Sequence, residues 1–551
     1  MVARTSVLAA LVALTLISVP LAGAIASPQS APTSSEIDSS ATTGNTTNES
    51  TDIVRQQQPP DPDEDVLGWE AGYWYNETID VTPEDGLNDS ELEAVVARGM
   101  ARVEKIRQLE FDEHPPVEVI SRETYREEVA NRTSKTTDAQ RLHQNVKWEA
   151  LFMVNETTDA TSVQENNQAG GVGGYYDSSS GEIKIVSENT STPKMNEITL
   201  AQELFHALQD QKFNMSSYNQ STQELHNAKD GIIEGDGNYV DHLYQERCEN
   251  EWEGTCIMPN ESAGSSDFEP HFGLYQILLQ PYSDGPAFVQ EIREEGGWEA
   301  VNAVYENPPQ STEQTIHPEK YGVDEPTNVS VPDESDERWR VLEINNSIDF
   351  ASFGEAGLYV TLWYPGVELS KQRGITTDGV IPFKDYDNDG PDSQIDPYNY
   401  AHNDTAGWDG DKLVPYVTDD SFETNETGYV YKTVWDTPED AAEFQEAYEE
   451  LLDIHDAEPV DGHLGTYEIS EDDDFGDAFY LNRTGKTLVI VNAPSVEELS
   501  GVRAGAAPEG ERTTPSESTT TSGPGFGILA TIAGVLALAV GLLGRGSSPR
   551  P

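Results

Sequence analysis

Residues 200–213 read LAQELFHALQDQKF, and the interpretation of the whole chain starts from this stretch. Its apolar residues recur at helical spacing, so a helix is expected, with Asn196 as its N-cap. Residues four apart share one face of a helix, which turns Gln202 and His206 toward a common partner. Glu203 stands between them. The simplest interpretation is a partly buried amphipathic helix whose histidine closes a polar pocket.

Elements of both kinds surround this helix. Downstream, the apolar pattern predicts a helix over Leu225–Glu246 that carries Glu234. Upstream, it predicts helices over 89–111, 122–133 (capped by Ser121) and 138–153, a strand over 116–121 and a hairpin over 170–187. The expected fold class is therefore α+β.

The order hairpin, motif helix and second helix resembles that of the glutamate-zincin metallopeptidases. The chain is similar to a group of them with a GFYD hairpin followed by HELxHALQDQ and EGxA; here these read GGYYD, QELFHALQDQ and EGDG. The resemblance extends over about residues 115–450, including 288–321, 407–413 and 434–448. It implies a zincin-like fold over 65–330 with an additional C-terminal α/β region over 331–498.

The resemblance also implies roles for three residues. Glu203 would be the general base on a zinc-bound water, and His206 and Glu234 would be zinc ligands. Gln202 replaces the first histidine, and Asp236 with Gly237 departs from the pattern after EG. A glutamine amide is a neutral oxygen donor, whereas zinc favours imidazole or thiolate and a catalytic site normally has three protein ligands. His226, His242 and His317 could substitute, but their spacing does not place them in the site.

Two function classes follow from this degenerate zinc site. We expect a non-catalytic surface protein that binds peptides or surface-layer proteins along the hairpin at 170–187. The alternative is an active, membrane-anchored metallopeptidase with an unusual ligand set. Gln202 favours the first, and the intact Glu203, His206 and Glu234 favour the second.

A second motif has calcium-loop spacing. DYDNDGPDSQID (385–396) places Asp385, Asp387 and Asp389 at positions 1, 3 and 5, a glycine at position 6 and Asp396 at position 12. Aspartate at position 12 is shorter than the usual glutamate, and no helical pattern flanks the loop. The pattern therefore predicts a free-standing calcium loop, with a solvated Asp/Gly turn as the alternative.

Both ends of the chain carry export signals. Residues 1–26 combine Arg4 with an apolar run and small residues, which predicts a secretory signal peptide. Residues 526–544 carry no charge and are long enough to span a bilayer, with a basic tail at 545–551 expected in the cytoplasm. Pro524, Gly525 and Phe526 before that helix resemble the sorting signal of haloarchaeal surface proteins, which implies cleavage by an archaeosortase and a lipid anchor. An ordinary transmembrane anchor is the alternative.

Sequons and cysteines fit an extracellular location. Fifteen Asn-x-Ser/Thr sites occur, including Asn76, Asn155 and Asn425, where chance would give about four. Cys248 and Cys256 are the only two cysteines, and in an oxidising compartment a disulfide between them is expected. Residues 27–64 and 499–525 are rich in Ser and Thr, which indicates a disordered linker and a stalk.

The charge balance excludes one class of partner. The chain has 100 acidic and 32 basic residues and a formal net charge of −68. Nucleic acid binding requires clustered lysine and arginine, so it is not expected. Nine Trp, 23 Tyr and 15 Phe supply the aromatic side chains of a folded core. Together these indicate a folded protein with the acidic, hydrated surface of an extreme halophile.

Overall fold

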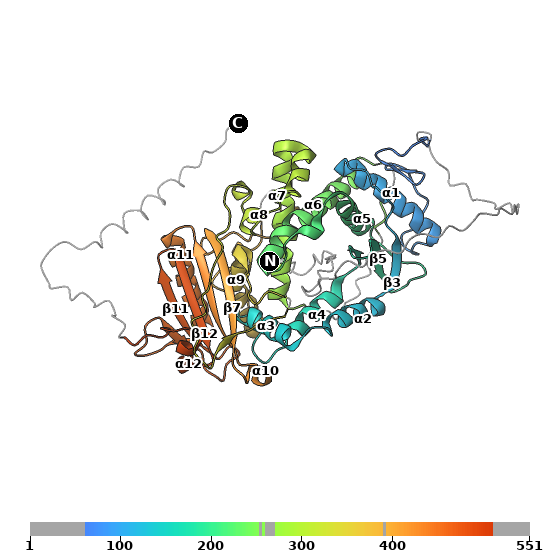
Figure 1. Ribbon diagram of the computed structural model, residues 1–551. Helices are drawn as coiled ribbons and strands as arrows, with labels where there is room; N and C mark the ends of the chain where they lie inside the picture. The colour runs from blue at the N-terminus through green and yellow to red at the C-terminus, as the bar shows by residue number, and fades with distance from the viewer. Residues whose placement is uncertain (1–60, 253–255, 259–269, 346, 389–392, 511–551) are drawn as a thin grey trace, which may run out of the picture.

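The computed structural model describes residues 61–252, 256–258, 270–345, 347–388 and 393–510. The segments predicted as signal peptide and sorting signal (Pro524–Phe526), most of the predicted N-terminal linker and the apolar segment 526–544 lie outside these residues. None of the helices in the described ranges is long and apolar enough to cross a membrane. Helices and strands are mixed, so the fold class is α+β as expected. Figure 1 shows a helical part with a small sheet, a large sheet at the other side, and α6 and α7 between them.

The helical part begins with a short hairpin and one long helix. Strands β1 (Trp69–Glu70) and β2 (Tyr73–Trp74) pair antiparallel beside α1 (Asp89–Arg107). A capping box between Asn88 and Glu91 starts α1, and Gln108 in the left-handed conformation ends it. α1 is four residues shorter than expected. It packs on α5 and α6.

A small sheet lies beneath these helices, with strand order β3-β5-β4. β3 (Val117–Ser121) runs parallel to β5 (Glu182–Ser187), and β4 (Gly174–Asp177) runs antiparallel to β5. The expected hairpin is present, and Gly181 adopts the positive φ of 73° that its turn requires. Helices α2 (Arg122–Thr133), α3 (Asp138–Glu149) and α4 (Ala160–Gly171) fill the connection between β3 and β4. The sequence pattern did not predict α4.

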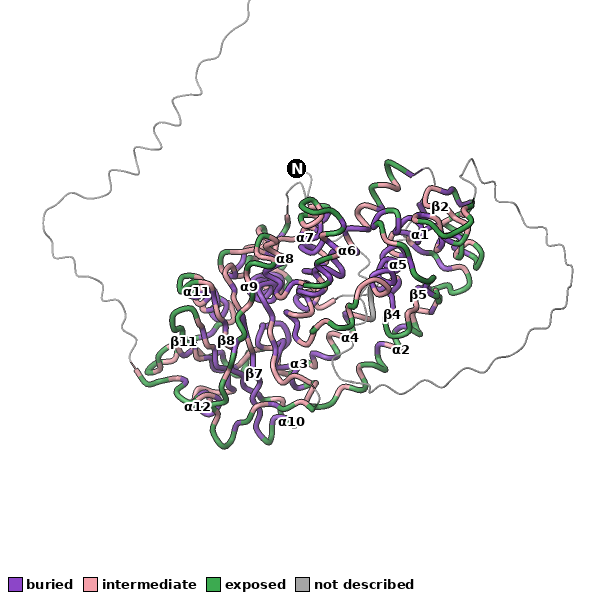
Figure 2. Tube along the Cα trace, turned by 45° about the horizontal axis from the view of Figure 1, so that its top comes forward, coloured by how far each residue is buried: buried purple, intermediate pink, exposed green. Residues whose placement is uncertain are grey.

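Three consecutive helices form the centre of the molecule: α5 (Glu197–Lys212), α6 (Gln223–Asn250) and α7 (Phe272–Val304). Asn196 caps α5 as expected, and α7 bends at Gly297. α5 is the most enclosed of them, because its residues from Leu200 to Gln209 are all buried, as the purple tube of Figure 2 shows. Any polar residue on α5 therefore needs a partner from a neighbouring helix.

A seven-stranded antiparallel sheet forms the C-terminal part, in the order β6-β7-β8-β12-β11-β10-β9. Successive side chains of its strands point to opposite faces of the sheet, and each face packs in its own hydrophobic core. Tyr429 and Tyr431 of β8 lie in the core beneath α9 and α11, and Val430 lies in the core beneath α12. The bounds are β6 (Arg340–Val341), α9 (Gly354–Arg373), β7 (Trp408–Val417), α10 (Ser421–Thr424), β8 (Gly428–Trp435), α11 (Pro438–Ile454), β9 (Glu458–Pro459), β10 (Thr466–Glu468), β11 (Ala478–Thr484), β12 (Thr487–Ala493) and α12 (Val496–Val502). Between α7 and this sheet lie α8 (Glu313–Ile316) and the short 3-10 helix Pro318–Lys320.

Two of the expected boundaries differ from the structure. α12 runs from Val496 to Val502 and the described chain continues to Gly510, past the boundary expected at 498, because Leu499 and Val502 cover a face of the sheet. The largest hydrophobic cluster also joins Trp148 and Phe152 of the N-terminal part to the C-terminal sheet. The two parts therefore share a core across the boundary expected at 330.

Candidate metal centre

Helix α5 brings three of the sequence-predicted residues to one buried place. Gln202, Glu203 and His206 are 4%, 0% and 1% exposed. Glu234 of α6, also 1% exposed, faces His206. The structure therefore brings together the two residues that the resemblance implied as metal ligands, with Glu203 on the same helix.

The orientation of His206 is set by Gln209, one turn further along α5. The Nε2 of Gln209 donates to the carbonyl of Ile233 at 2.9 Å, so its Oε1 must be the atom that lies 2.7 Å from Nδ1 of His206. A carbonyl oxygen can only accept, and Nδ1 therefore carries a proton. A histidine that binds a metal through one nitrogen holds its other N–H in the same way.

The other nitrogen of His206 faces Glu234. Nε2 lies 3.4 Å from Oε2 of Glu234, which is longer than an ordinary N–H···O hydrogen bond of about 2.7–3.2 Å. Two ligands of one tetrahedral zinc, each about 2.05 Å from the ion, are about 3.3 Å apart. The pair thus has the spacing of two ligands on one ion, as well as that of an ion pair.

Each residue of the sequence EGDG (234–237) has its own contact. A Cβ on Gly235 would meet the backbone of Gly285 on α7 at 2.6 Å, and one on Gly237 would meet Cε1 of His206 at 3.3 Å. The two carboxylate oxygens of Asp236 share the single N–H of Arg107 Nε, each at 3.0 Å. The departure at Asp236 and Gly237 is therefore structural: it supports α6 against α1 and α5.

A chain of hydrogen bonds connects this support to His206. The hydroxyl of Tyr305 donates to Oδ2 of Asp236 at 2.8 Å and accepts a hydrogen bond from Nε2 of Gln209 at 2.6 Å. Arg107 and Asp236 are both buried, and the guanidinium lies 4.3 Å from the ring centre of Trp298. Sequence reasoning missed this network, since only Gln209 lies at helical spacing from the motif.

The electrostatics of the centre are dominated by carboxyl groups. Burial alone would lower the pKa of His206, but the charges of Glu234 and Glu203 outweigh it and raise that pKa to about 9. Burial raises the pKa of Asp230 and of Asp241 well above the ordinary range, with Glu234 adding to both shifts and His206 opposing them. Burial therefore favours the neutral, protonated form of both groups beside the centre.

Tyr282 of α7 completes the surroundings. Burial raises the pKa of its hydroxyl, and the charges of Glu234 and Asp230 raise it further. A neutral hydroxyl can donate to Glu234 without adding charge. Neither Tyr282 nor the two aspartic acids carried a sequence signal.

The histidines considered as substitutes for the missing ligand have other positions. His226 pairs with Asp230 at 3.2 Å, and His317 pairs with Glu355 of α9 at 3.1 Å. His242 lies further along α6, beyond Asn238 and Asp241. The donors at the centre are thus one imidazole, carboxylates and the Gln202 amide. This set suits zinc at two positions and offers a hard, neutral oxygen at the third.

The expected calcium loop is described only in part, because Asp389 lies outside the described residues. Asp385 ends a 3-10 helix, Phe383–Asp385, and Asp387 bridges to Tyr398. Asp396 accepts from the hydroxyl of Ser283 at 2.8 Å and from Nδ2 of Asn388 at 3.0 Å. The bond from Ser283 attaches the loop to α7, and the bond from Asn388 lies within the loop.

A different group of acids does meet the spacing of a metal site. Glu313, Asp324 and Asp436 bring ligand atoms within 4.8 Å of one another among the described residues, so they could hold a metal ion. Lys320 pairs with all three, at 3.4 Å for Asp324 and Asp436. The lysine already supplies a cation there, and the sequence pattern did not indicate this group.

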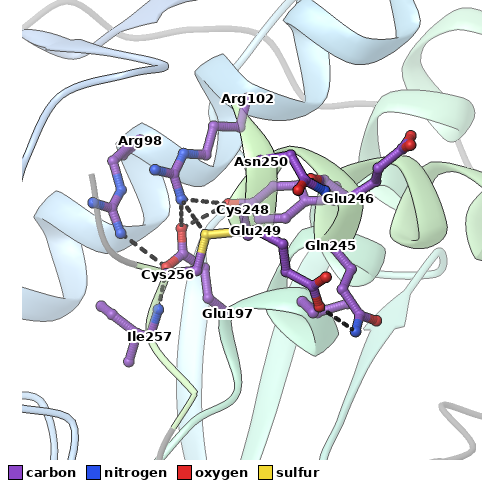
Figure 3. Close-up of a disulfide and its surroundings, with 12 residues drawn as sticks. Arg98, Arg102, Glu197, Gln245, Glu246, Cys248, Glu249, Asn250, Cys256 and Ile257 are labelled. Atoms are coloured by element: carbon purple, nitrogen blue, oxygen red, sulfur yellow. Dashed lines mark hydrogen bonds and ion pairs between the residues drawn. A yellow bond between two sulfur atoms is a disulfide. The ribbon is translucent and has the colours of Figure 1, made fainter. Parts of the chain in front are cut away.

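Cys248 and Cys256 form the expected disulfide, and it lies against the start of α5 (Figure 3). Ile257, next to Cys256, donates its N–H to Oε2 of Glu197 at 2.7 Å. Glu197 also pairs with Arg98 at 2.8 Å and Arg102 at 2.6 Å, all three side chains being fully buried. The disulfide thus anchors the N-terminus of the helix that carries the centre.

Comparison with known proteins gives one match. No curated protein and no solved structure matches the chain. Residues 340–503 match the model of a family described as a domain of unknown function, DUF8575. This range begins at β6 and ends just after α12, so it comprises the seven-stranded sheet and its covering helices.

Proposed function

We propose that this chain is an exported, glycosylated haloarchaeal surface protein with a zincin-like centre that binds peptides or surface-layer proteins without cleaving them. A lipid placed by an archaeosortase, or the segment 526–544 itself, would anchor it to the membrane. The observation that carries the proposal is the buried pair His206–Glu234, 3.4 Å apart, with glutamine at the neighbouring ligand position. Two ligands of zinc spacing support a metal-centre ancestry, and Gln202 supports the loss of catalysis.

The sheet edge beside the centre supports a peptide as the ligand. β4 is an end strand of its sheet, and α5 packs against it. A Cβ on Gly174 of β4 would lie 3.7 Å from Cγ of Glu203. An extended peptide pairing with β4 would therefore pass the centre, and its backbone hydrogen bonds would provide affinity without catalysis.

The assembled Glu203, His206 and Glu234 favour a second candidate, an active metallopeptidase. A zinc ion held by His206 and Glu234 would polarise a bound water or a peptide carbonyl. Glu203, fully buried on the same helix, would then accept the proton of that water.

Metal analysis separates the two candidates. The wild-type chain, purified in molar salt, should contain little zinc, whereas Gln202→His should take up about one ion. At a hundredfold excess over its Kd, zinc should stabilise that variant by about 2.7 kcal/mol. Gln202→Ala is the matched control, because it removes the amide without adding a ligand.

Two results would decide against this proposal. One zinc per wild-type chain, with peptidase activity that Glu203→Gln abolishes, would establish the active enzyme. Absence of zinc from the Gln202→His variant would show that His206 and Glu234 do not form a metal centre.

A further inference from the structure

A cavity of about 550 Å³ lies where the N-terminal part meets the DUF8575 region. Its walls come from residues 152–158, from the second half of α9, and from the end of α11 with the loop 469–475. Aromatic rings form one side: His455 stacks on Phe152 with centroids 4.5 Å apart, and Phe475 lies 5.2 Å from Phe152. Carboxylates, among them Glu368 and Asp473, contribute to the lining.

Asn155 stands in this lining and begins a sequon, Asn155-Glu156-Thr157. Its Oδ1 accepts from the hydroxyls of Thr157 at 3.0 Å and Thr158 at 2.7 Å. Its Nδ2 donates to Oδ1 of Asp474 at 3.1 Å, which belongs to another wall of the cavity. A group attached to Nδ2 would therefore start inside the cavity mouth.

The burial of the sequons distinguishes Asn155 from the others. Nine of the twelve sequon asparagines that the structure describes are exposed, and Asn76, Asn155 and Asn425 are half-buried. Of these three, Asn155 lines the cavity and Asn76 and Asn425 do not. Asn155 keeps the second N–H of its amide for a bond to another group.

We propose that Asn155 is glycosylated and that the first sugars of its glycan fill this cavity. An oligosaccharide carried on a lipid phosphate supplies them: a bond forms between Nδ2 and the anomeric carbon, the bond from that carbon to the phosphate oxygen breaks, the phosphate leaves with the electron pair and Nδ2 loses one proton. The remaining N–H stays on Asp474. The apolar face of a sugar stacks on half-buried rings such as His455 and Phe475, and its hydroxyls donate to carboxylates such as Glu368.

The glycan then connects two parts of the chain that are far apart in sequence. It is attached at residue 155 and contacts the walls formed by α9 and by residues 469–475. Its removal leaves the cavity to water and frees the two loops to exchange with solvent. The effect is local, so it appears as amide exchange and not as a loss of fold.

The test uses the full chain from its own producing cells. Site-resolved mass spectrometry should find a glycan on Asn155, and Thr157→Val should abolish it while leaving the bond to Asp474. Amide exchange in 152–158 and 469–475 should then rise about tenfold, with α1 unchanged. The matched control is Asn403→Gln, an exposed sequon outside the cavity lining, which should leave both loops unaffected.

Three results would overturn the inference. The first is an unmodified Asn155 on a chain whose exposed sequons carry glycans, which leaves the proposed export intact. The second is a modified Asn155 whose loss changes no exchange at either loop, because the glycan then points to solvent. The third is a chain without glycans at any sequon, which also counts against the surface location.

Discussion

Gly235 of α6 and Gly285 of α7 meet backbone to backbone. A Cβ built on Gly235 would lie 2.6 Å from the carbonyl carbon and oxygen of Gly285, and one on Gly285 would lie 2.8 Å from Cα of Gly235. Real Cβ atoms do not approach backbone so closely, so α6 and α7 can cross here only because both residues are glycine. The crossing holds Glu234, the neighbour of Gly235, beside His206.

Gly235→Ala should therefore destabilise the chain by about 1–3 kcal/mol, because overpacking at a rigid backbone cannot be relieved by a side-chain rotation. The measurement is the midpoint of denaturant unfolding in molar salt. Gly173→Ala is the control: its Cβ would have Thr199 at 3.9 Å as its nearest contact, so its cost should stay below about 1 kcal/mol. Equal midpoints for the two variants would contradict the close crossing.

Asp236→Asn should cost about 3–5 kcal/mol, because it leaves the buried guanidinium of Arg107 without its counter-charge. Asp419→Asn tests the same chemistry at the surface, where Arg340 and Asp419 are 50% and 96% exposed, and should change stability by less than about 1 kcal/mol. Both are read from unfolding midpoints. A cost at Asp236 as small as that at Asp419 would mean that the buried pair of Arg107 and Asp236 does not contribute to the stability of the fold.

Stability should fall as the pH rises from about 6 to 9.5. Burial raises the pKa of Glu104 to about 9 and that of Glu70 to about 7. The neighbouring Glu70 carboxyl raises the pKa of Glu104 further. A carboxyl whose pKa is raised in the folded state contributes its full stabilisation below its unfolded pKa of about 4.3. That contribution falls as the pH rises and is lost once the pH passes the folded pKa.

Glu104→Gln should flatten this pH dependence, because the amide cannot ionise; its one oxygen can accept from Gly68 or from Phe111, so the variant keeps one of these two backbone hydrogen bonds. Thermal melts at pH 6 and 9.5 measure it, with the exposed Glu118→Gln as the control. A Glu104→Gln variant that keeps the wild-type difference in Tm would show that this pair is not the titrating group.

Replacing Cys248 and Cys256 together with serine should cost about 2.5 kcal/mol, the loop-closure estimate for a separation of 8 residues. Because the N–H of Ile257 binds Glu197, the first residues of α5 should also exchange their amide protons faster in this variant than in the wild type. The change should be larger there than in the middle of the helix. Hydrogen exchange measures both. Unchanged protection at the start of α5 would show that Arg98 and Arg102 anchor Glu197 without the disulfide.

The net charge of −68 predicts a requirement for salt. The Debye length is about 3 Å in 1 M salt and about 10 Å in 0.1 M salt, so dilution restores repulsion between surface carboxylates. The Tm should fall steeply below about 1 M, as followed by circular dichroism. A Tm that is the same in 0.1 and 3 M salt would exclude the halophilic interpretation.

Local signals in the sequence determined the elements around the centre. The N-caps Ser121 and Asn196 start their helices as expected, and the hairpin and the helix after it lie within a few residues of their predicted bounds. Capping, turn chemistry and helical periodicity act over a few residues, so one sequence is enough to show them. The helix α4 was missed because its apolar pattern is weak.

Only the tertiary structure decided what surrounds His206. Arg107 comes from α1, Asp230 and Asp241 come from α6, Tyr282 comes from α7 and Tyr305 is the C-cap of α7; no spacing in the sequence links them to residue 206. The same holds for the crossing of Gly235 with Gly285 and for the shared core of Trp148 with the C-terminal sheet. Contacts between distant segments depend on how helices pack, and packing is set by the shapes of surfaces that the chain brings together only after it has folded.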